Sequence, residues 1–139
     1  MGPVADEWLG VLERFVCDGG KRIRPTFLWF GWLAAGGDHY PELTDALHNV
    51  AASLEFVQAG ALIHDDIIDA SETRRGRPAA HTHFSSQHAQ AVTTHQATGD
   101  SATIGQSAAI LLGDIALSWA DDMFLSAGSV SYTHLTLPT

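Results

Sequence analysis

A long helical pattern without interruption runs through the middle of the chain. Between Glu42 and Asp69 there is no proline, and Gly60 is the only glycine. Apolar side chains recur there at steps of three and four residues, the spacing that places them on one face of a helix. A single helix of this length favours a large all-α bundle over a small compact domain. The apolar positions that define the pattern are Leu43, Leu47, Val50, Leu54, Val57 and Ala61.

Shorter helical segments lie on both sides of this long one. Trp8–Cys17 has helical periodicity and ends before a glycine pair, and Thr26–Ala35 follows Pro25, a residue favoured in the first turn of a helix. Ser101–Phe124 has the same kind of periodicity. No segment alternates apolar and polar residues over the length of a strand, so we expect an all-α fold.

Three other stretches lack a clear helical pattern. Ser71–Pro78 is predicted to be a polar, arginine-rich loop. His81–Asp100 is rich in His, Thr, Gln and Ser, and its weak periodicity predicts a loop or a poorly packed helix. The sequence changes character at Ser129–Thr139, which resembles translated vector sequence. We therefore divide the chain into a domain over residues 1–126 and a non-native read-through tail over 127–139.

The composition of the 139-residue chain limits its class and its partners. With 45% hydrophobic and 17% charged residues, the chain can form a core. Its net charge of −9 argues against binding to nucleic acid, which requires a basic surface. Cys17 is the only cysteine, which excludes an internal disulfide and fits a reducing compartment. The most apolar stretch has about half the length of a membrane span, and no secretory signal is visible, so we expect a soluble cytoplasmic protein.

Three aspartates at the end of the long segment oppose the stability of a helix. Asp65 and Asp69 are four residues apart, so their carboxylates project from one face, with Asp66 between them and Gln58 two turns earlier. Like charges at this spacing cost about 0.2–0.5 kcal/mol, and acids near a helix C-terminus cost a further ~0.3–1 kcal/mol. Divalent cations reverse this effect, and Mg²⁺ favours one or two carboxylates together with phosphate oxygens. The alternative interpretation is a solvated acidic helix end.

Six of the seven cationic residues fall in two clusters. The first cluster follows a glycine pair, and the second follows the acidic segment. A glycine pair lets the backbone approach an anion, and arginine binds phosphate oxygens in bidentate fashion. Two such clusters beside an acidic metal site indicate a ligand with two phosphate-bearing ends, or two such ligands. The alternative is salt bridges to the surplus acids, in particular for Arg22 and Arg77. The clusters are Lys21, Arg22 and Arg24, and Arg74, Arg75 and Arg77.

Three motifs, in this order, resemble those of the trans-isoprenyl diphosphate synthases, also called polyprenyl synthetases. They are Gly-Gly-Lys-Arg-Ile-Arg-Pro at 19–25, Ala-Leu-Ile-His-Asp-Asp-Ile-Ile-Asp at 61–69 and Arg-Arg-Gly-Arg-Pro at 74–78. Leu-Leu-Gly-Asp at 111–114 also matches. The resemblance extends from Gly19 to about Phe124 and implies the N-terminal half of the isoprenoid synthase helical bundle.

The resemblance implies a prenyltransferase that condenses isopentenyl diphosphate with an allylic prenyl diphosphate. Asp65 and Asp69 would bind Mg²⁺, with Asp66 supporting them, and these three aspartates would form the catalytic centre. The allylic diphosphate would be held by Arg74. Isopentenyl diphosphate would be held by Lys21, Arg24 and Arg75, with Gln58 at a position where the family often has a histidine.

The family uses a second aspartate-rich motif, which this chain lacks. Asp121 and Asp122 have no third aspartate at the required spacing and lie too early. We therefore expect the chain to be truncated before that motif, to be inactive alone and to form a homodimer when full length. The alternatives are a non-catalytic partner subunit of a prenyltransferase and a class I terpene cyclase, and only the synthase is expected to bind isopentenyl diphosphate.

Small residues before the aspartate motif bear on product length. In the family, bulky residues at this place block the growing chain, whereas Gly60 and Ala61 would leave the pocket open. This pattern favours products longer than farnesyl, with geranylgeranyl diphosphate as the first choice. Close helix packing at Gly60 and Ala61 is the alternative.

Two other groups of residues are given the simpler of two interpretations. His81, His83, His88 and His95 are attributed to an ordinary polar segment rather than a zinc site, because they lack cysteine partners and regular spacing. The aromatic residues Phe27, Trp29, Phe30 and Trp32 are attributed to core or subunit packing, and the alternative for one or two of them is a wall facing the isoprenoid chain.

Overall fold

The computed structural model describes residues 2–128 and consists almost entirely of helices. In chain order, the elements are α1 (Pro3–Cys17), α2 (Ile23–Ala34), the 3₁₀ turns η1 (Gly37–His39) and η2 (Pro41–Leu43), α3 (Thr44–Ile68), the strands β1 (Thr73–Arg74) and β2 (Arg77–Pro78), α4 (Ala80–Thr93) and α5 (Ser101–Ser126). The all-α prediction is confirmed.

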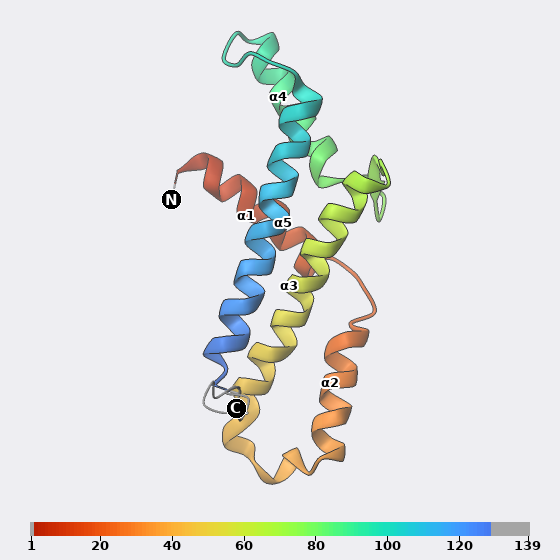
Figure 1. Cartoon of the computed structure of the whole chain (residues 1–139), viewed down its shortest axis with the longest axis vertical. Helices are drawn as coiled ribbons and strands as arrows, with labels where there is room; N and C mark the ends of the chain where they lie inside the picture. The colour runs from red at the N-terminus through yellow and green to blue at the C-terminus, as the bar shows by residue number, and fades with distance from the viewer. Residues whose placement is uncertain (1, 129–139) are drawn as a thin grey trace, which may run out of the picture.

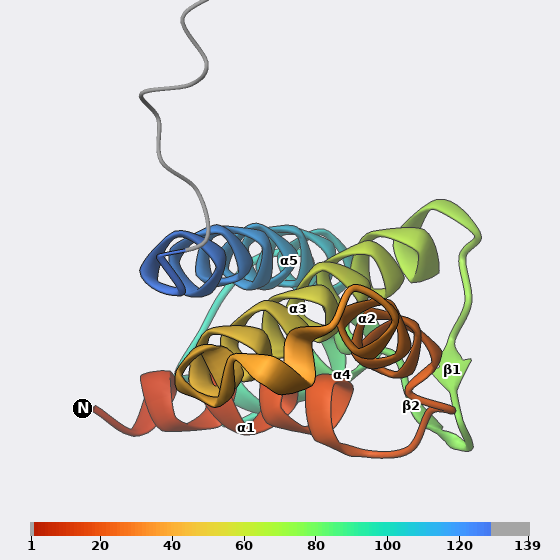
Figure 2. The same cartoon turned by 90° about the horizontal axis from the view of Figure 1, so that it is seen from below.

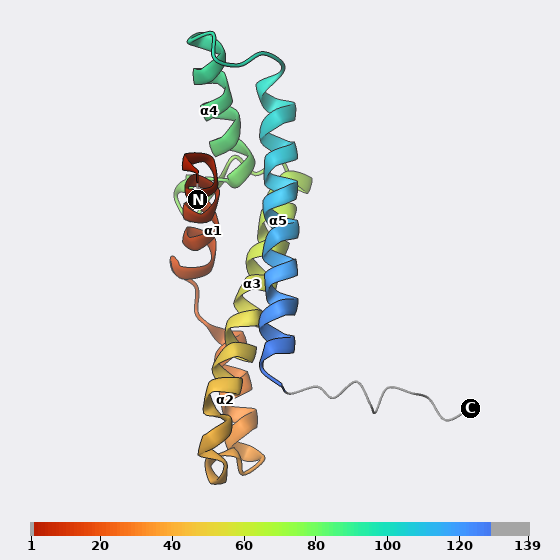
Figure 3. The ribbon, with the colours of Figure 1, turned by 90° about the vertical axis from the view of Figure 1, so that its left-hand side faces the viewer.

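Two long helices, α3 and α5, run side by side and form the centre of the molecule (Figure 1). Helix α2 lies along the first half of α3, and α4 packs against the first half of α5. Figure 3 shows α1 and α4 on one side of this pair, while Figure 2 shows the β1–β2 hairpin at the edge, beyond the end of α3. The end of α3, the hairpin and the α1–α2 connection therefore form one region.

The core lies where α1, α3, α4 and α5 meet. Its buried side chains come from all four helices and are mainly aliphatic, with alanine at the closest approach of the helices. Glycine permits the same approach between α3 and α5, because a Cβ on Gly60 would lie 3.0 Å from the carbonyl oxygen of Gly113. The core residues are Val11, Leu12, Ala59, Ile63, Ala80, Phe84, Ala109, Leu112 and Ala116.

Of the two alternatives predicted for His81–Asp100, the helix is correct for most of that stretch, and the loop is correct only after Thr93. Residues Ala80–Thr93 form α4, and Phe84 is buried with its ring 5.2 Å from that of Trp8. The contact with α5 is so close that a Cβ on Gly105 would lie 2.0 Å from Ser85 Oγ. Helix α4 buries few apolar side chains because its partner presents glycine and alanine, which explains the weak periodicity.

The predicted arginine-rich loop contains a short antiparallel hairpin. Thr73 pairs with Pro78 and Arg74 with Arg77, which leaves Arg75 and Gly76 as a two-residue turn. Both turn residues have positive φ, +54° and +76°, as in the type I′ turns that fit the twist of a hairpin. Strands of two residues are too short to produce the alternation that predicts a sheet.

Helix α2 contributes no fully buried residue, so its aromatic side chains are not part of the core among residues 2–128. Phe27 is 72% exposed and Phe30 is 61% exposed. The interpretation as core residues is therefore wrong for Phe27 and Phe30, and their packing against a second subunit stays a prediction. Trp29 stacks on His48 at a ring distance of 6.5 Å, and Trp32 lies against Gly37.

Two further predictions concern membrane-spanning segments and the C-terminal tail. No helix among residues 2–128 combines the length and the apolar character needed to cross a membrane. The proposed non-native tail begins just after α5, which ends at Ser126, and its residues 129–139 lie outside the described part.

Candidate diphosphate and metal site

The three aspartates at the end of α3 have different surroundings. Asp66 is completely buried, whereas the side chain of Asp65 is 56% exposed. Asp69 is exposed and caps the helix, and its N–H donates to the carbonyl oxygen of Asp65 at 2.8 Å, so the two residues are one helical turn apart. The two exposed carboxylates are available to a ligand, while Asp66 faces the protein.

Asp66 binds Arg74 of the hairpin. Arg74 Nε donates to both carboxylate oxygens at 2.9 and 2.8 Å, and Nη2 donates to Oδ1 at 2.6 Å. The hydrogen bond and the charge of Asp66 raise the pKa of the Arg74 guanidinium despite the opposing effect of burial. Arg74 Nη2 also lies 3.9 Å from Asp65 Oδ2. The buried acid thus fixes a cation next to the exposed carboxylates.

Four residues predicted to hold isopentenyl diphosphate line one pocket of about 210 Å³. They come from four places in the chain: the α1–α2 connection, the first turn of α2, the middle of α3 and the hairpin turn. Among residues 2–128, no ion pair joins Lys21, Arg24 or Arg75 to an acid, so these three charges remain available. The four residues are Lys21, Arg24, Gln58 and Arg75.

Arg22 lines the same pocket but is bound to the protein. It donates to the carbonyl oxygens of Val16 at 2.6 Å and Cys17 at 2.8 Å, and it forms an ion pair with Glu55 of α3. Its backbone lies in the left-handed region at φ +47°, a costly conformation for a residue with a side chain. Arg22 therefore joins the end of α1 to α3 and fixes the segment that carries Lys21 and Arg24.

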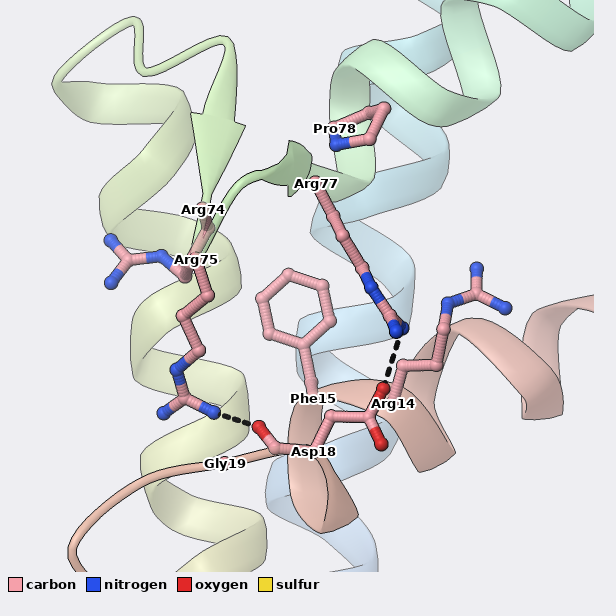
Figure 4. Close-up of a pocket in the computed structure, with 8 residues that line it drawn as sticks. All are labelled: Arg14, Phe15, Asp18, Gly19, Arg74, Arg75, Arg77 and Pro78. Carbon is pink, nitrogen blue, oxygen red and sulfur yellow. Dashed lines mark hydrogen bonds and ion pairs between the residues drawn. The ribbon is translucent and has the colours of Figure 1, made fainter.

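Arg77 is also paired, with Asp18 at the end of α1 at 2.6 Å. The salt-bridge alternative for Arg22 and Arg77 is thus confirmed. Asp18 also accepts a hydrogen bond from Arg75 at its backbone carbonyl, as Figure 4 shows. A second pocket of about 240 Å³ lies on this side of Arg75, between the end of α1 and the hairpin, and is lined by Arg14, Phe15, Asp18, Gly19, Arg74, Arg75, Arg77 and Pro78.

His64 is a residue of this region that the motif contains but to which the sequence analysis assigned no role. Its ring crosses to α5, where Nε2 lies 3.1 Å from the Ile110 carbonyl oxygen and 3.7 Å from Asp114. A Cβ on Gly113 would lie 2.1 Å from the same nitrogen, so the ring occupies the space that this glycine leaves. The Leu-Leu-Gly-Asp match at 111–114 was the available signal for this contact.

Gly60 and Ala61 face different surroundings. Gly60 is buried against Gly113 and Leu117 of α5, so close helix packing accounts for it. Ala61 is exposed, and of the two residues it alone can affect a ligand beside α3 without disturbing that contact.

The exposed carboxylates fit magnesium as part of a shared site. No group of three or more His, Cys, Asp or Glu side chains within residues 2–128 is placed to hold a metal ion without other ligands. Asp65 and Asp69 present two exposed carboxylates one turn apart, an arrangement that matches the preference of Mg²⁺ for one or two carboxylates plus phosphate oxygens.

The fold and the site define a helical protein with two exposed carboxylates at the end of α3 and a pocket lined by three cations that form no ion pair within residues 2–128. The sequence profile described as polyprenyl synthetase matches residues 6–137. The chain therefore belongs to the polyprenyl synthetase family.

Individual relatives agree with this assignment. The chain is 34% identical over 116 residues to the short chain isoprenyl diphosphate synthase of Methanothermobacter thermautotrophicus, covering 84% of this chain and 28% of that protein. It is 38% identical over 88 residues to heptaprenyl diphosphate synthase component 2 of Geobacillus stearothermophilus, covering 63% and 25%.

A solved structure shares the fold. Geranylgeranyl pyrophosphate synthase from Corynebacterium glutamicum, complexed with isoprenyl diphosphate and magnesium, superposes with a TM-score of 0.80 at 45% identity. The match covers 94% of this chain and 35% of that one. The chain thus spans about a quarter to a third of the length of these relatives.

Proposed function

We propose that the chain is the N-terminal part of a trans-prenyltransferase that condenses isopentenyl diphosphate with an allylic prenyl diphosphate. One observation carries the proposal: Lys21, Arg24, Gln58 and Arg75 line a single pocket. Three cations that form no ion pair within residues 2–128, together with an amide, suit a diphosphate, because charge-assisted hydrogen bonds are the strongest contacts that side chains make with phosphate oxygens.

The second substrate would lie near the end of α3. Gln58 is seven residues before Asp65, which corresponds to about 10 Å along a helix. Asp65 and Asp69 would hold Mg²⁺ together with the allylic diphosphate, and Arg74, oriented by Asp66, would contact the same group. When bound, Mg²⁺ would neutralise the negative charge on the leaving diphosphate. The two binding regions then place the isopentenyl double bond next to the allylic carbon.

The reaction forms one carbon–carbon bond and breaks one carbon–oxygen bond. The isopentenyl double bond attacks the allylic carbon, diphosphate leaves, and loss of a proton gives a product five carbons longer. Lys21, Arg24 and Arg75 hold the isopentenyl diphosphate group, which is retained in the product. No side chain of residues 2–128 is assigned to the proton transfer, which the leaving diphosphate can perform.

Calorimetric titration of the 139-residue chain with isopentenyl diphosphate tests the proposal. We expect saturable binding without metal, and weaker binding to the Lys21→Gln and Arg24→Gln variants. Glu13→Ala, on an exposed position of α1 outside the pocket, is the control. Absence of binding by the unaltered chain would reject the synthase and leave the partner subunit or the terpene cyclase.

We propose further that the chain is inactive alone because the second aspartate-rich motif is missing. A chimera of residues 1–126 with the remainder of the Corynebacterium glutamicum synthase should condense both substrates in the presence of Mg²⁺. The separate 139-residue chain should not, and turnover by it would contradict the prediction. Because the chain belongs to the polyprenyl synthetase family, we also propose that the full-length protein forms a homodimer and is cytoplasmic.

A non-catalytic partner subunit is the second candidate. The similarity to heptaprenyl diphosphate synthase component 2 shows that this family includes a protein named as one component of a synthase. The chimera separates the two candidates, since a subunit that has lost catalysis would not support turnover.

A further inference from the structure

We propose that Asp18 is a positioning residue: it holds the arginine hairpin against the end of α1, so that Arg75 closes the isopentenyl diphosphate pocket. This inference rests on the proposed function of that pocket. Asp18 lies just before the Gly19-Gly20 pair and is named by none of the motifs.

Asp18 contacts the hairpin at two points. Its carboxylate accepts a hydrogen bond from Arg77 Nη1 at 2.6 Å, and its backbone carbonyl accepts one from Arg75 Nη1. Figure 4 shows both side chains reaching across from the hairpin to this one residue. Asp18 thereby joins two segments that lie more than fifty residues apart in the chain.

These two contacts, which we call the Asp18 clamp, bear on Arg75 in different ways: the backbone carbonyl binds its guanidinium directly, and the carboxylate holds the hairpin through Arg77. The guanidinium rests against the glycine pair, since a Cβ on Gly20 would lie 3.3 Å from Arg75 Nη2 and one on Gly19 would lie 3.5 Å from Nη1. From there Arg75 forms a wall of the pocket shared with Lys21, Arg24 and Gln58. Both glycines have positive φ, so this close approach uses their backbone freedom and their lack of a side chain.

The backbone of Arg75 shows that its placement has a cost. Arg75 sits at φ +54° in a two-residue turn, where Asn, Asp and Gly are the favoured residues. An arginine in the left-handed region persists only where neighbouring contacts hold it. On this hairpin those contacts are the Arg74–Asp66 bonds on one side and the Asp18 clamp on the other.

Charge and positioning predict opposite effects of removing the Asp18 side chain. Asp18 is a negative charge beside a pocket for an anion, so charge alone predicts that Asp18→Ala binds isopentenyl diphosphate more tightly. Asp18→Ala keeps the backbone carbonyl that binds Arg75 and removes the carboxylate that holds Arg77. If the hold on Arg77 keeps the hairpin, and Arg75 with it, in place, the variant binds about twofold to tenfold more weakly, because one long side chain must then be ordered on binding. Glu13→Ala is the matched control, because it removes an exposed acid from α1 that is not paired within residues 2–128.

The swapped pair Asp18→Arg with Arg77→Asp distinguishes the clamp from a direct contact of Arg77 with the ligand. The swap restores an ion pair with reversed polarity, and it should recover most of the affinity that Asp18→Arg alone loses. Melting temperatures should stay close to that of the unaltered chain, because exposed ion pairs contribute little to stability. Equal or tighter binding by Asp18→Ala, or no recovery in the swap, would overturn the proposal.

A measurement without ligand keeps the two proposals separate. The Nε–H group of Arg75 should give an ordered NMR signal in the unaltered chain and a mobile one in Asp18→Ala. If the unaltered chain does not bind isopentenyl diphosphate, the proposed function fails while this signal still tests the clamp. An Arg75 side chain that is equally ordered in both proteins would show that Asp18 does not position it.

Discussion

Arg74 donates three hydrogen bonds to the carboxylate of Asp66, and that carboxylate is completely buried. The pair connects the hairpin to the last turn of α3, directly beside the exposed Asp65. The second aspartate of the motif therefore has a different task from its neighbours: it holds an arginine within the protein, whereas Asp65 and Asp69 stay exposed to a ligand.

The first prediction concerns this pair. Arg74→Met should destabilise the chain by about 3 kcal/mol, because it leaves a buried carboxylate without its counter-charge. The double variant Arg74→Met with Asp66→Leu should be more stable than Arg74→Met alone, since it removes the unpaired charge as well. Urea unfolding followed by circular dichroism measures both. A double variant less stable than the single one would show that the carboxylate does not depend on Arg74.

The second prediction concerns the α4–α5 contact. An alanine at Gly105 would place its Cβ 2.5 Å from the carbonyl oxygen of His81 and 2.7 Å from the backbone nitrogen of Ser85, so the helices must separate. Gly105→Ala should cost about 1–3 kcal/mol of unfolding free energy. Gly31→Ala, in α2, meets nothing within 4 Å and should stabilise the chain by about 0.5–1 kcal/mol. Equal unfolding free energies for the two variants would contradict this packing.

This contact also explains where the sequence was informative and where it was not. The long helix was predictable, because Leu47 and Ile63 of α3 bury aliphatic side chains against other elements. Helix α4 was predicted only as one of two alternatives, because it buries just Ala80 and Phe84 and its close contact with α5 is made at Gly105, so its own sequence carries little periodic signal. A glycine can mark a close contact between two helices, and a search for hydrophobic periodicity does not detect such a contact.

The candidate site shows a similar division. Residue types and their order indicated the two cation clusters, and the structure brings Lys21, Arg24 and Arg75 to one pocket. From the sequence, Arg22 and Arg77 were candidates for salt bridges, but their partners could not be identified. Glu55, the partner of Arg22, and Asp18, the partner of Arg77, lie far from them in the chain and belong to no motif. Long-range pairing of exposed charges depends on the fold, and one sequence does not record it.

The third prediction concerns pH and the start of α5. Asp100 caps this helix by accepting hydrogen bonds from Thr103 N at 2.8 Å and Thr103 Oγ1 at 2.6 Å, and these bonds lower the pKa of the Asp100 carboxyl below its ordinary 3.8. A lowered folded-state pKa means that the stabilisation is present above pH 3.8 and is lost as the pH falls through the folded-state value.

Thermal melts from pH 7 to pH 2.5 test this sign. At pH 7, Asp100→Ala should have a lower melting temperature than the unaltered chain. The difference between the two melting temperatures should become smaller below pH 3.8. Asp100→Asn keeps an oxygen acceptor that does not titrate, so it should stay closer to the unaltered chain at pH 7. A gap for Asp100→Ala that persists unchanged to pH 2.5 would show that the charge of the cap does not contribute.

The fourth prediction concerns product length and uses the chimera with the Corynebacterium glutamicum synthase. Ala61 is exposed one turn before Asp65, while Gly60 is occupied by the contact with α5. Under the proposed function, a phenylalanine at position 61 would therefore add bulk beside the growing prenyl chain without separating α3 from α5. Ala61→Phe should shift the products of the chimera to shorter prenyl diphosphates, and chromatography of the dephosphorylated alcohols measures the shift. Ala61→Ser, which stays small, should leave the products unchanged. If Ala61→Phe gives the same product spectrum as the unaltered chimera, the open pocket at this position does not set the length, and the contribution of this segment to product length is rejected.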